Sequence, residues 1–337
     1  MVKRIVTVFG GSGFVGRHLV RHLATDGATV RVAVRDPEDA RYLKIMGEVG
    51  QIVPFAADVR NEATLAAAVE GAESVVNLVG ILSEWRAQNF ANVHTQGAAN
   101  VAKAAAAADV ARLVQISAIG ANEKSGARYA QTKAAGEAAI YAEFPNATII
   151  RPSVIFGPED HFFNFFAGLA RFTWVMPVFG CPVIPILKWF TDDAILNIDF
   201  YGDGGTKFQP VYVDDVAAAI VSALAVEDAP GKTYELGGPS VYSSVDIMRM
   251  LTKIIGRKRL LVPIPFWYLA IWGWLLQKIP APLLTYDQVK QLEADNVVSE
   301  GAKTLADLGV MATPAEAILP GYLSRFKKVG HEAASST

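Results

Sequence analysis

The sequence predicts an α/β fold in which a doubly wound parallel sheet is followed by a smaller, apolar C-terminal lobe. Three observations predict it. Short β-branched runs alternate with Ala- and Leu-rich helical patterns over residues 1–150, the first of these runs ends in closely spaced glycines, and beyond residue 150 the chain becomes rich in proline and aromatic residues. Strands that alternate with helices indicate βαβ units, whose strands lie parallel with helices on both faces.

Six strands are expected in the first part of the chain, at residues 4–9, 29–34, 51–56, 74–79, 111–117 and 146–151. In the second part, residues 214–227 have the pattern of a helix and residues 233–236 that of a strand. We therefore expect three units: an N-terminal domain at 1–150, a mixed lobe at 151–330 that is interleaved with it, and a flexible tail at 331–337.

The composition limits the function. A chain of 337 residues that is 52% hydrophobic can bury a substantial core, and a net charge of −2 without a basic run gives no reason to expect a nucleic-acid partner. The single cysteine, Cys181, cannot form an internal disulfide, and we expect an inert thiol in a reducing compartment. No metal site and no iron–sulfur cluster are expected, and the first residues do not resemble a targeting peptide.

The glycine-rich segment VFGGSGFVGRHLV follows the first strand and opens the first helix. Glycine lets the backbone turn tightly and approach a pyrophosphate, whose charge is met by the N–H groups of the helix start. Glycine also serves tight turns for structural reasons alone, but this position favours a Rossmann-type dinucleotide site. The loop residues expected at the cofactor are Gly10, Ser12, Gly13, Phe14, Val15, Gly16 and Arg17.

The end of the second strand predicts which dinucleotide is bound. Arg35 stands where an acidic residue would hold the ribose 2′-hydroxyl of NAD(H), and a guanidinium suits a 2′-phosphate. NADPH is therefore the expected cofactor. The alternative is that Arg35 is a solvent-exposed strand end and that Asp36 acts as an NAD-type ligand displaced by one residue.

Several motifs together resemble the extended and atypical short-chain dehydrogenase/reductases over most of the chain. They are the glycine spacing, Asp58-Val59 after the third strand, NLVG at 77–80, Tyr129-x-x-x-Lys133 and RPSVIFGP at 151–158. The resemblance implies that further cofactor contacts come from Asp58, Val59, Leu78, Val79, Gly80, Pro152, Ser153, Val154 and Ile155. Asp58 and Gly80 also have structural alternatives, as a helix cap and a simple turn.

Tyr129 and Lys133 lie one helical turn apart, so the ammonium can lower the phenol pKa and hydrogen-bond the nicotinamide ribose. Working members of the family also need a Ser or Thr near the end of the fifth strand. Here Ser117 is followed by Ala118 and Ile119, and without an aligned hydroxyl a substrate carbonyl loses orientation and polarisation. We expect a vestigial dyad that holds the cofactor, unless a shift of register lets Ser117 substitute.

An uncharged apolar run occupies residues 266–276, and five of the six tryptophans lie between residues 174 and 274. The run is too short to span a bilayer. Two alternatives follow: a buried helix of the second lobe, or an interfacial helix that gives residues 263–279 contact with lipid.

The chain also resembles one branch of this family, the dehydrogenase-like accessory subunits of respiratory complex I. The segments that carry this resemblance are 128–139, 151–171, 208–217, 232–239 and 284–298. The resemblance implies a non-catalytic NADPH-binding subunit that stabilises the junction of the hydrophilic and membrane arms, with other complex I subunits as partners. It also implies a peripheral place on the cytoplasmic face of a bacterial inner membrane. Residues 181–205 look like an insertion. The alternatives are an NADP-dependent reductase, epimerase or dehydratase, and a regulatory protein that senses NADPH.

Overall fold

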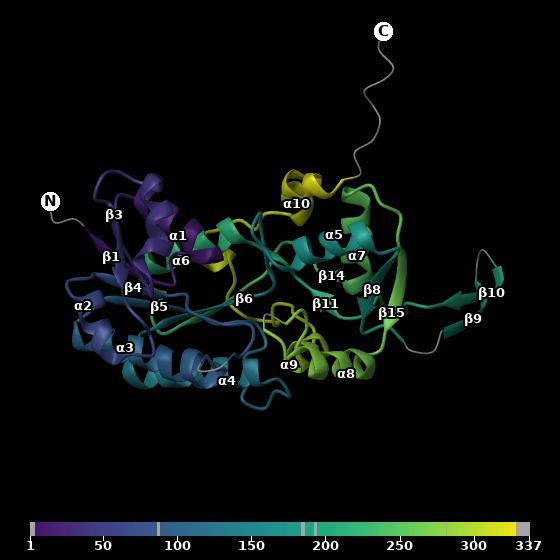
Figure 1. Ribbon diagram of the computed structural model, residues 1–337, viewed down its shortest axis with the longest axis horizontal. Helices are drawn as coiled ribbons and strands as arrows, with labels where there is room; N and C mark the ends of the chain where they lie inside the picture. Colours follow the sequence, from purple (N-terminus) through teal and green to yellow (C-terminus); the bar gives the residue numbers. More distant parts are fainter. Residues whose placement is uncertain (1–3, 86–87, 183–185, 192–193, 281, 328–337) are drawn as a thin grey trace, which may run out of the picture.

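A seven-stranded parallel sheet with the order β13-β6-β5-β4-β1-β2-β3 forms the centre of the N-terminal part (Figure 1). The computed structural model describes residues 4–85, 88–182, 186–191, 194–280 and 282–327. The strands are β1 (Ile5–Phe9), β2 (Thr29–Val34), β3 (Ile52–Ala56), β4 (Ser74–Asn77), β5 (Arg112–Ile116), β6 (Thr148–Pro152) and β13 (Thr233–Leu236). The expected doubly wound fold is confirmed. The strand order reverses between β1 and β4, which is where such sheets bind ligands.

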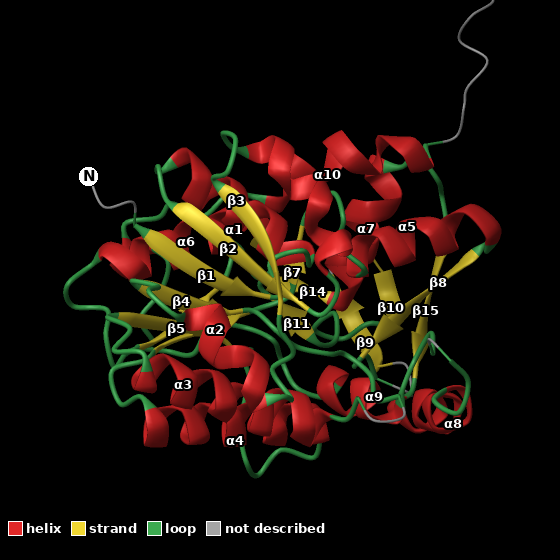
Figure 2. Cartoon of the chain, turned by 60° about the vertical axis from the view of Figure 1, so that its left-hand side comes forward, coloured by secondary structure: helices red, strands yellow, loops and turns green. Residues whose placement is uncertain are grey.

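Helices cover both faces of the sheet (Figure 2). Val8 packs with the helices of one face and its neighbour Phe9 with those of the other, because successive side chains of a strand point in opposite directions. One face carries α1 (Phe14–Thr25) and α6 (Val213–Ala225). The other carries α2 (Leu65–Val69), α3 (Gly97–Ala107) and α4 (Arg128–Glu143), with η2 (Glu62–Thr64) and η3 (Ala91–Gln96) in its connections. The 3-10 segment η1 (Pro37–Met46) packs beside α1 on the first face.

Helix α6, which comes from beyond residue 150, completes the helical layer that contains α1. Helix α6 packs on α1, where Asp214 lies 2.8 Å from both the Nδ1 atom of His18 and the guanidinium of Arg21. Hydrogen bonds with His18 and His22 lower the pKa of Asp214. The domain boundary near residue 150 stays a prediction. Helix α6 packs on α1 and strand β13 joins the central sheet, so both elements from beyond residue 150 pack with the N-terminal part.

A second hydrophobic core lies in the C-terminal lobe, where Phe163, Met248 and Leu319 are buried together. Tyr322 ties the last helix to this lobe by donating a hydrogen bond of 2.5 Å to Asp160. The lobe contains α5 (Phe162–Phe172), α7 (Ser244–Ile254), α10 (Ala315–Leu323), η4 (Ala306–Leu308), η5 (Ser324–Phe326) and the paired strands β7 (Ile155–Phe156) with β12 (Val211–Tyr212), β8 (Val175–Phe179) with β15 (Leu260–Ile264) and β11 (Lys207–Phe208) with β14 (Tyr242–Ser243).

Helix α8 (Phe266–Leu276) coincides with the expected apolar run, and α9 (Tyr286–Leu292) packs beside it. The unassigned stretch at 181–205 includes an antiparallel hairpin of β9 (Ile186–Thr191) and β10 (Ala194–Asp199), which projects from the right-hand edge in Figure 1. Among the described residues, no helix is long and apolar enough to cross a bilayer. The expected tail at 331–337 lies outside the described residues.

Candidate functional site

The glycine loop leaves the start of α1 open to an anion. Gly10 has φ +75° and donates a hydrogen bond of 3.0 Å to the carbonyl oxygen of Ala33. A Cβ on Gly16 would lie 2.5 Å from the Gly10 carbonyl oxygen, so only glycine fits there. Gly13 begins α1 without a side-chain cap, and the first turn has no acidic residue. The unpaired N–H groups and the helix dipole are therefore available to a pyrophosphate.

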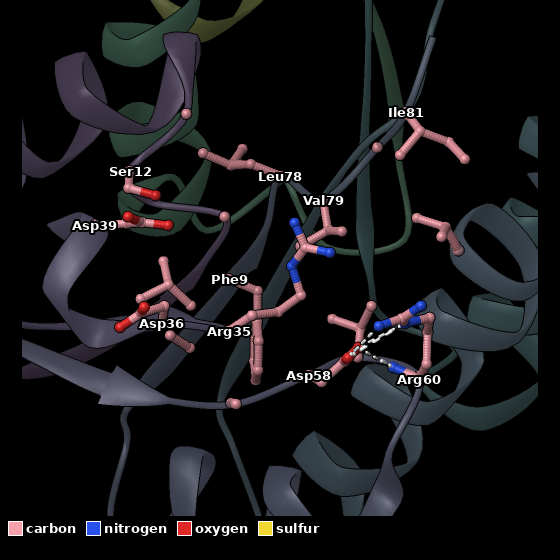
Figure 3. Close-up of a pocket in the computed structure, with 18 of the residues that line it drawn as sticks. Phe9, Ser12, Arg35, Asp36, Asp39, Asp58, Arg60, Leu78, Val79 and Ile81 are labelled. Atoms are coloured by element: carbon pink, nitrogen blue, oxygen red, sulfur yellow. Dashed lines mark hydrogen bonds and ion pairs between the residues drawn. The ribbon is translucent and has the colours of Figure 1, made fainter. Parts of the chain in front are cut away.

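A cavity of about 270 Å³ opens beside this loop at the carboxyl ends of the central strands (Figure 3). Nine of the predicted cofactor residues line it: Gly10, Ser12, Gly13, Arg35, Asp58, Val59, Leu78, Val79 and Gly80. Its place at the reversal of strand order is the ligand site of doubly wound sheets.

Two arginines and three carboxylates surround one end of the cavity. The Arg35 guanidinium extends into it, and Arg60, which the sequence reasoning missed, makes two-pronged hydrogen bonds to Asp58 at 2.6–3.2 Å (Figure 3). Those bonds are the main cause of a lowered pKa of Asp58. Asp36 accepts the backbone N–H of Glu38 as the cap of the following turn, so its carboxylate is partly used within the chain. The fifth charged residue of the lining is Asp39.

Lys133 lies buried behind the turn at Gly80. Its Nζ atom donates a hydrogen bond of 3.4 Å to the carbonyl oxygen of Ile116, and a Cβ on Gly80 would approach Nζ to 3.3 Å. Burial lowers the pKa of Lys133 to about 8. The ammonium thus stands next to a residue that lines the cavity.

The expected lowering of the Tyr129 pKa by Lys133 is wrong for this structure. Burial raises the pKa of Tyr129 to about 12, and the negative charge of Asp287 adds to the increase. The phenol ring packs edge-on against Phe90 and His94, and its centre lies 5.8 Å from Nζ of Lys133. A group with this pKa keeps its proton near neutral pH.

His94 is a further site residue that the sequence reasoning missed. Its Nε2 atom accepts the backbone N–H of Ile81 at 3.0 Å, and its Nδ1 atom lies 3.2 Å from the Thr132 hydroxyl. Burial and the nearby Lys133 lower the pKa of His94 to about 3, so the ring is neutral. His94 therefore fixes the turn that carries Gly80 along the cavity.

Ser117 is buried, and its hydroxyl has no hydrogen-bond partner among the described residues. A buried polar group without a partner costs roughly 1–3 kcal/mol, which a ligand hydrogen bond would offset. The structure therefore fits a bound molecule near the end of β5, on the side of the sheet that carries Lys133.

The remaining predicted residues lie outside the lining of the cavity. Ser153 donates its hydroxyl hydrogen bond to Asn296 at 2.7 Å, and Asn296 also accepts the N–H of Val154 at 2.9 Å, so this segment is held by the chain itself. Arg17 reaches Glu159 at 3.4 Å. Those outside the lining are Phe14, Val15, Gly16, Arg17, Ser117, Tyr129, Lys133, Pro152, Ser153, Val154 and Ile155.

The sequence of the chain is similar to those of known proteins. The profile of a family described as NAD(P)H-binding matches residues 10–161. NADH dehydrogenase [ubiquinone] 1 alpha subcomplex subunit 9 of Arabidopsis thaliana is 35% identical over 98% of this chain and 80% of its own length. The chain belongs to the family of this complex I subunit. The expected resemblance to this branch is thereby confirmed, as is a domain of the NAD(P)H-binding type.

The relatives also include an enzyme. Ceramide reductase of Caulobacter vibrioides is 31% identical over 78% of this chain and 74% of its own length. An NADPH-dependent quinone oxidoreductase of Escherichia coli, solved with NADPH, superposes with a TM-score of 0.66 over 95% of this chain and 97% of the other, at 20% identity. That likeness concerns the fold alone.

Proposed function

We propose that this chain is a non-catalytic accessory subunit of respiratory complex I that holds NADPH as a structural ligand and stabilises the junction of the hydrophilic and membrane arms. The observation that carries the proposal is a dinucleotide cavity, lined by nine of the predicted cofactor residues, in a chain that belongs to the family of a complex I subunit. A ligand that binds only the folded state stabilises that state by mass action, so NADPH needs no turnover to be useful.

The choice of NADPH over NADH rests on Arg35 in the lining of the cavity. The Arg35 guanidinium has no hydrogen-bond partner among the described residues, whereas Asp36 is engaged as a cap. A 2′-phosphate beside Arg35 would gain charge-assisted hydrogen bonds, whereas Arg60 is already paired with Asp58. The carboxylates of Asp39 and Asp58 oppose this preference, although Asp58 is already neutralised by Arg60.

The apolar helix α8 supports a place at the membrane junction. The two expected alternatives were a buried and an interfacial helix, and only Leu269 and Gly273 of α8 are buried. Trp267 is 63% exposed and Trp274 is 52% exposed, with the Lys278 ammonium 3.7 Å from the centre of the Trp274 ring. Exposed Trp beside Lys suits the headgroup level of a bilayer, and we infer that α8 contacts lipid.

The proposal is tested by tagging the chain in its own cells, isolating the respiratory complex in mild detergent and extracting bound nucleotide. Co-migration with NADH:ubiquinone oxidoreductase activity on a native gel, with NADPH present in a ratio near one per chain, supports it. A chain that never accompanies the complex refutes it.

A reductase is the second candidate, because the ceramide reductase relative retains similarity over most of both chains. The unpaired Ser117 hydroxyl also leaves a donor near Lys133 that a substrate oxygen could use. This candidate predicts NADPH consumption with ceramide-type ketones that disappears in Tyr129→Phe. The accessory function predicts no turnover in the wild-type chain or in Tyr129→Phe.

A further inference from the structure

Helix α4, which carries Tyr129 and Lys133, begins without a cap of its own. Its N-cap residue is Ala127, whose side chain cannot accept a hydrogen bond. Asp287 of α9 supplies the missing acceptors, because its two carboxylate oxygens accept the N–H groups of Arg128 at 2.5 Å and Tyr129 at 3.1 Å. A carboxylate at a helix start also interacts favourably with the helix dipole.

Asp287 is itself held in place within α9, whose start contacts α8. Thr285 and Gln288 form a capping box at the start of α9, and Gln291 donates a hydrogen bond of 3.1 Å to Asp287. Helix α8 presses on this start, since a Cβ on Gly273 would lie within 2.8 Å of the Thr285 backbone. Helix α8 and the start of α9 are therefore closely packed, so a shift of α8 should displace the start of α9 and Asp287 with it.

One turn further along, α4 contacts the cofactor site. Lys133 lies one turn beyond Tyr129 and donates to the Ile116 carbonyl next to Ser117, and its Nζ atom also lies against Gly80. The segment 284–298 thus connects the exposed apolar helix with the dinucleotide site through packed and hydrogen-bonded groups. It also holds the end of β6 through Asn296.

We propose that Asp287 is a positioning residue that couples the lipid-facing helix α8 to the dinucleotide site, so that bilayer contact and NADPH binding strengthen each other. This inference rests on the proposed function for both ligands. Coupling between two sites is reciprocal, because each ligand must change the affinity of the other by the same factor.

The test uses the full chain with NADPH and phosphatidylglycerol vesicles. The dissociation constant of NADPH is measured with and without vesicles, and vesicle binding is measured with and without NADPH. We expect each ligand to tighten the other about fivefold or more, within the usual range of coupling energies. Asp287→Asn removes the carboxylate charge and one hydrogen-bond acceptor. The factor by which each ligand changes the affinity of the other should then fall to near one, while vesicle binding without NADPH is unchanged.

Asp246→Asn is the matched control, since Asp246 bonds Ser243 at the start of its own helix α7 in the same lobe. It should lower thermal stability and keep the coupling factor. Binding of both ligands without mutual effect in the wild-type chain overturns the coupling alone, as does equal coupling in Asp287→Asn. Failure to bind NADPH or vesicles overturns the proposed function as well. The wild-type measurement decides the matter even if Asp287→Asn does not fold.

Discussion

The ammonium nitrogen of Lys133 lies 3.4 Å from the carbonyl oxygen of Ile116, which is its hydrogen-bond acceptor among the described residues. One long hydrogen bond does not replace the water lost on burial, and the pKa of Lys133 falls to about 8. Ribose hydroxyls of a bound dinucleotide would add acceptors for this ammonium and raise its pKa.

NADPH binding should therefore take up a proton near and above pH 8. The free protein loses the Lys133 proton as the pH rises through about 8, whereas the complex keeps it, so the affinity should weaken as the pH rises further. Each unit of pKa difference corresponds to about 1.4 kcal/mol. Calorimetry at pH 8.5 in buffers of different ionisation enthalpy measures the uptake. Lys133→Met should abolish it, and equal uptake in both proteins would contradict this role.

Arg35→Ala should weaken NADPH binding roughly 10- to 100-fold, the effect of losing a hydrogen bond to a charged group, and leave NADH binding within about twofold. Titration of both dinucleotides by fluorescence measures the ratio. Arg41→Ala is the control, because Arg41 lies outside the cavity lining and is paired with Glu38 instead. An equal loss for NADH and NADPH would show that Arg35 does not face the 2′-phosphate.

Gly16→Ala should abolish retention of the nucleotide and lower the melting temperature, because the new Cβ would stand 2.5 Å from the Gly10 carbonyl oxygen. Overpacking of this kind costs about 1–3 kcal/mol. The control is Gly321→Ala in α10, where a Cβ meets nothing within 4 Å and the helix gains from the loss of glycine. Nucleotide content after gel filtration and thermal scans of both variants decide the matter.

Trp267→Ser combined with Trp274→Ser should reduce vesicle binding on the order of tenfold or more, since each removes a large aromatic surface from the proposed interface. Met311→Ser is the control, because Met311 is 90% exposed and its neighbours Val310 and Ala312 pack against a different hydrophobic core from the one that α8 joins. Co-sedimentation with vesicles measures the effect. Unchanged binding in the double variant would place the lipid contact elsewhere.

Local pattern accounts for what the sequence predicted well. Local residues determine the six strands of the first part, the glycine loop and the bounds of α8. Periodicity, glycine spacing and flanking prolines can therefore be recognised in the sequence itself. Nine of the predicted cofactor residues line the cavity for the same reason, because each lies in the loop that follows a strand whose carboxyl end faces the cavity.

Only the tertiary structure decided how distant groups combine. Asp287 and Asn296 act on α4 and on the end of β6 across separations of 158 and 142 residues, which no local pattern reveals. The raised pKa of Tyr129 depends on burial and on the charge of Asp287, so the spacing Tyr129-x-x-x-Lys133 could not foretell it. Likewise, α8 is equally apolar whether buried or exposed, and only the packing of its neighbours left its tryptophans at the surface.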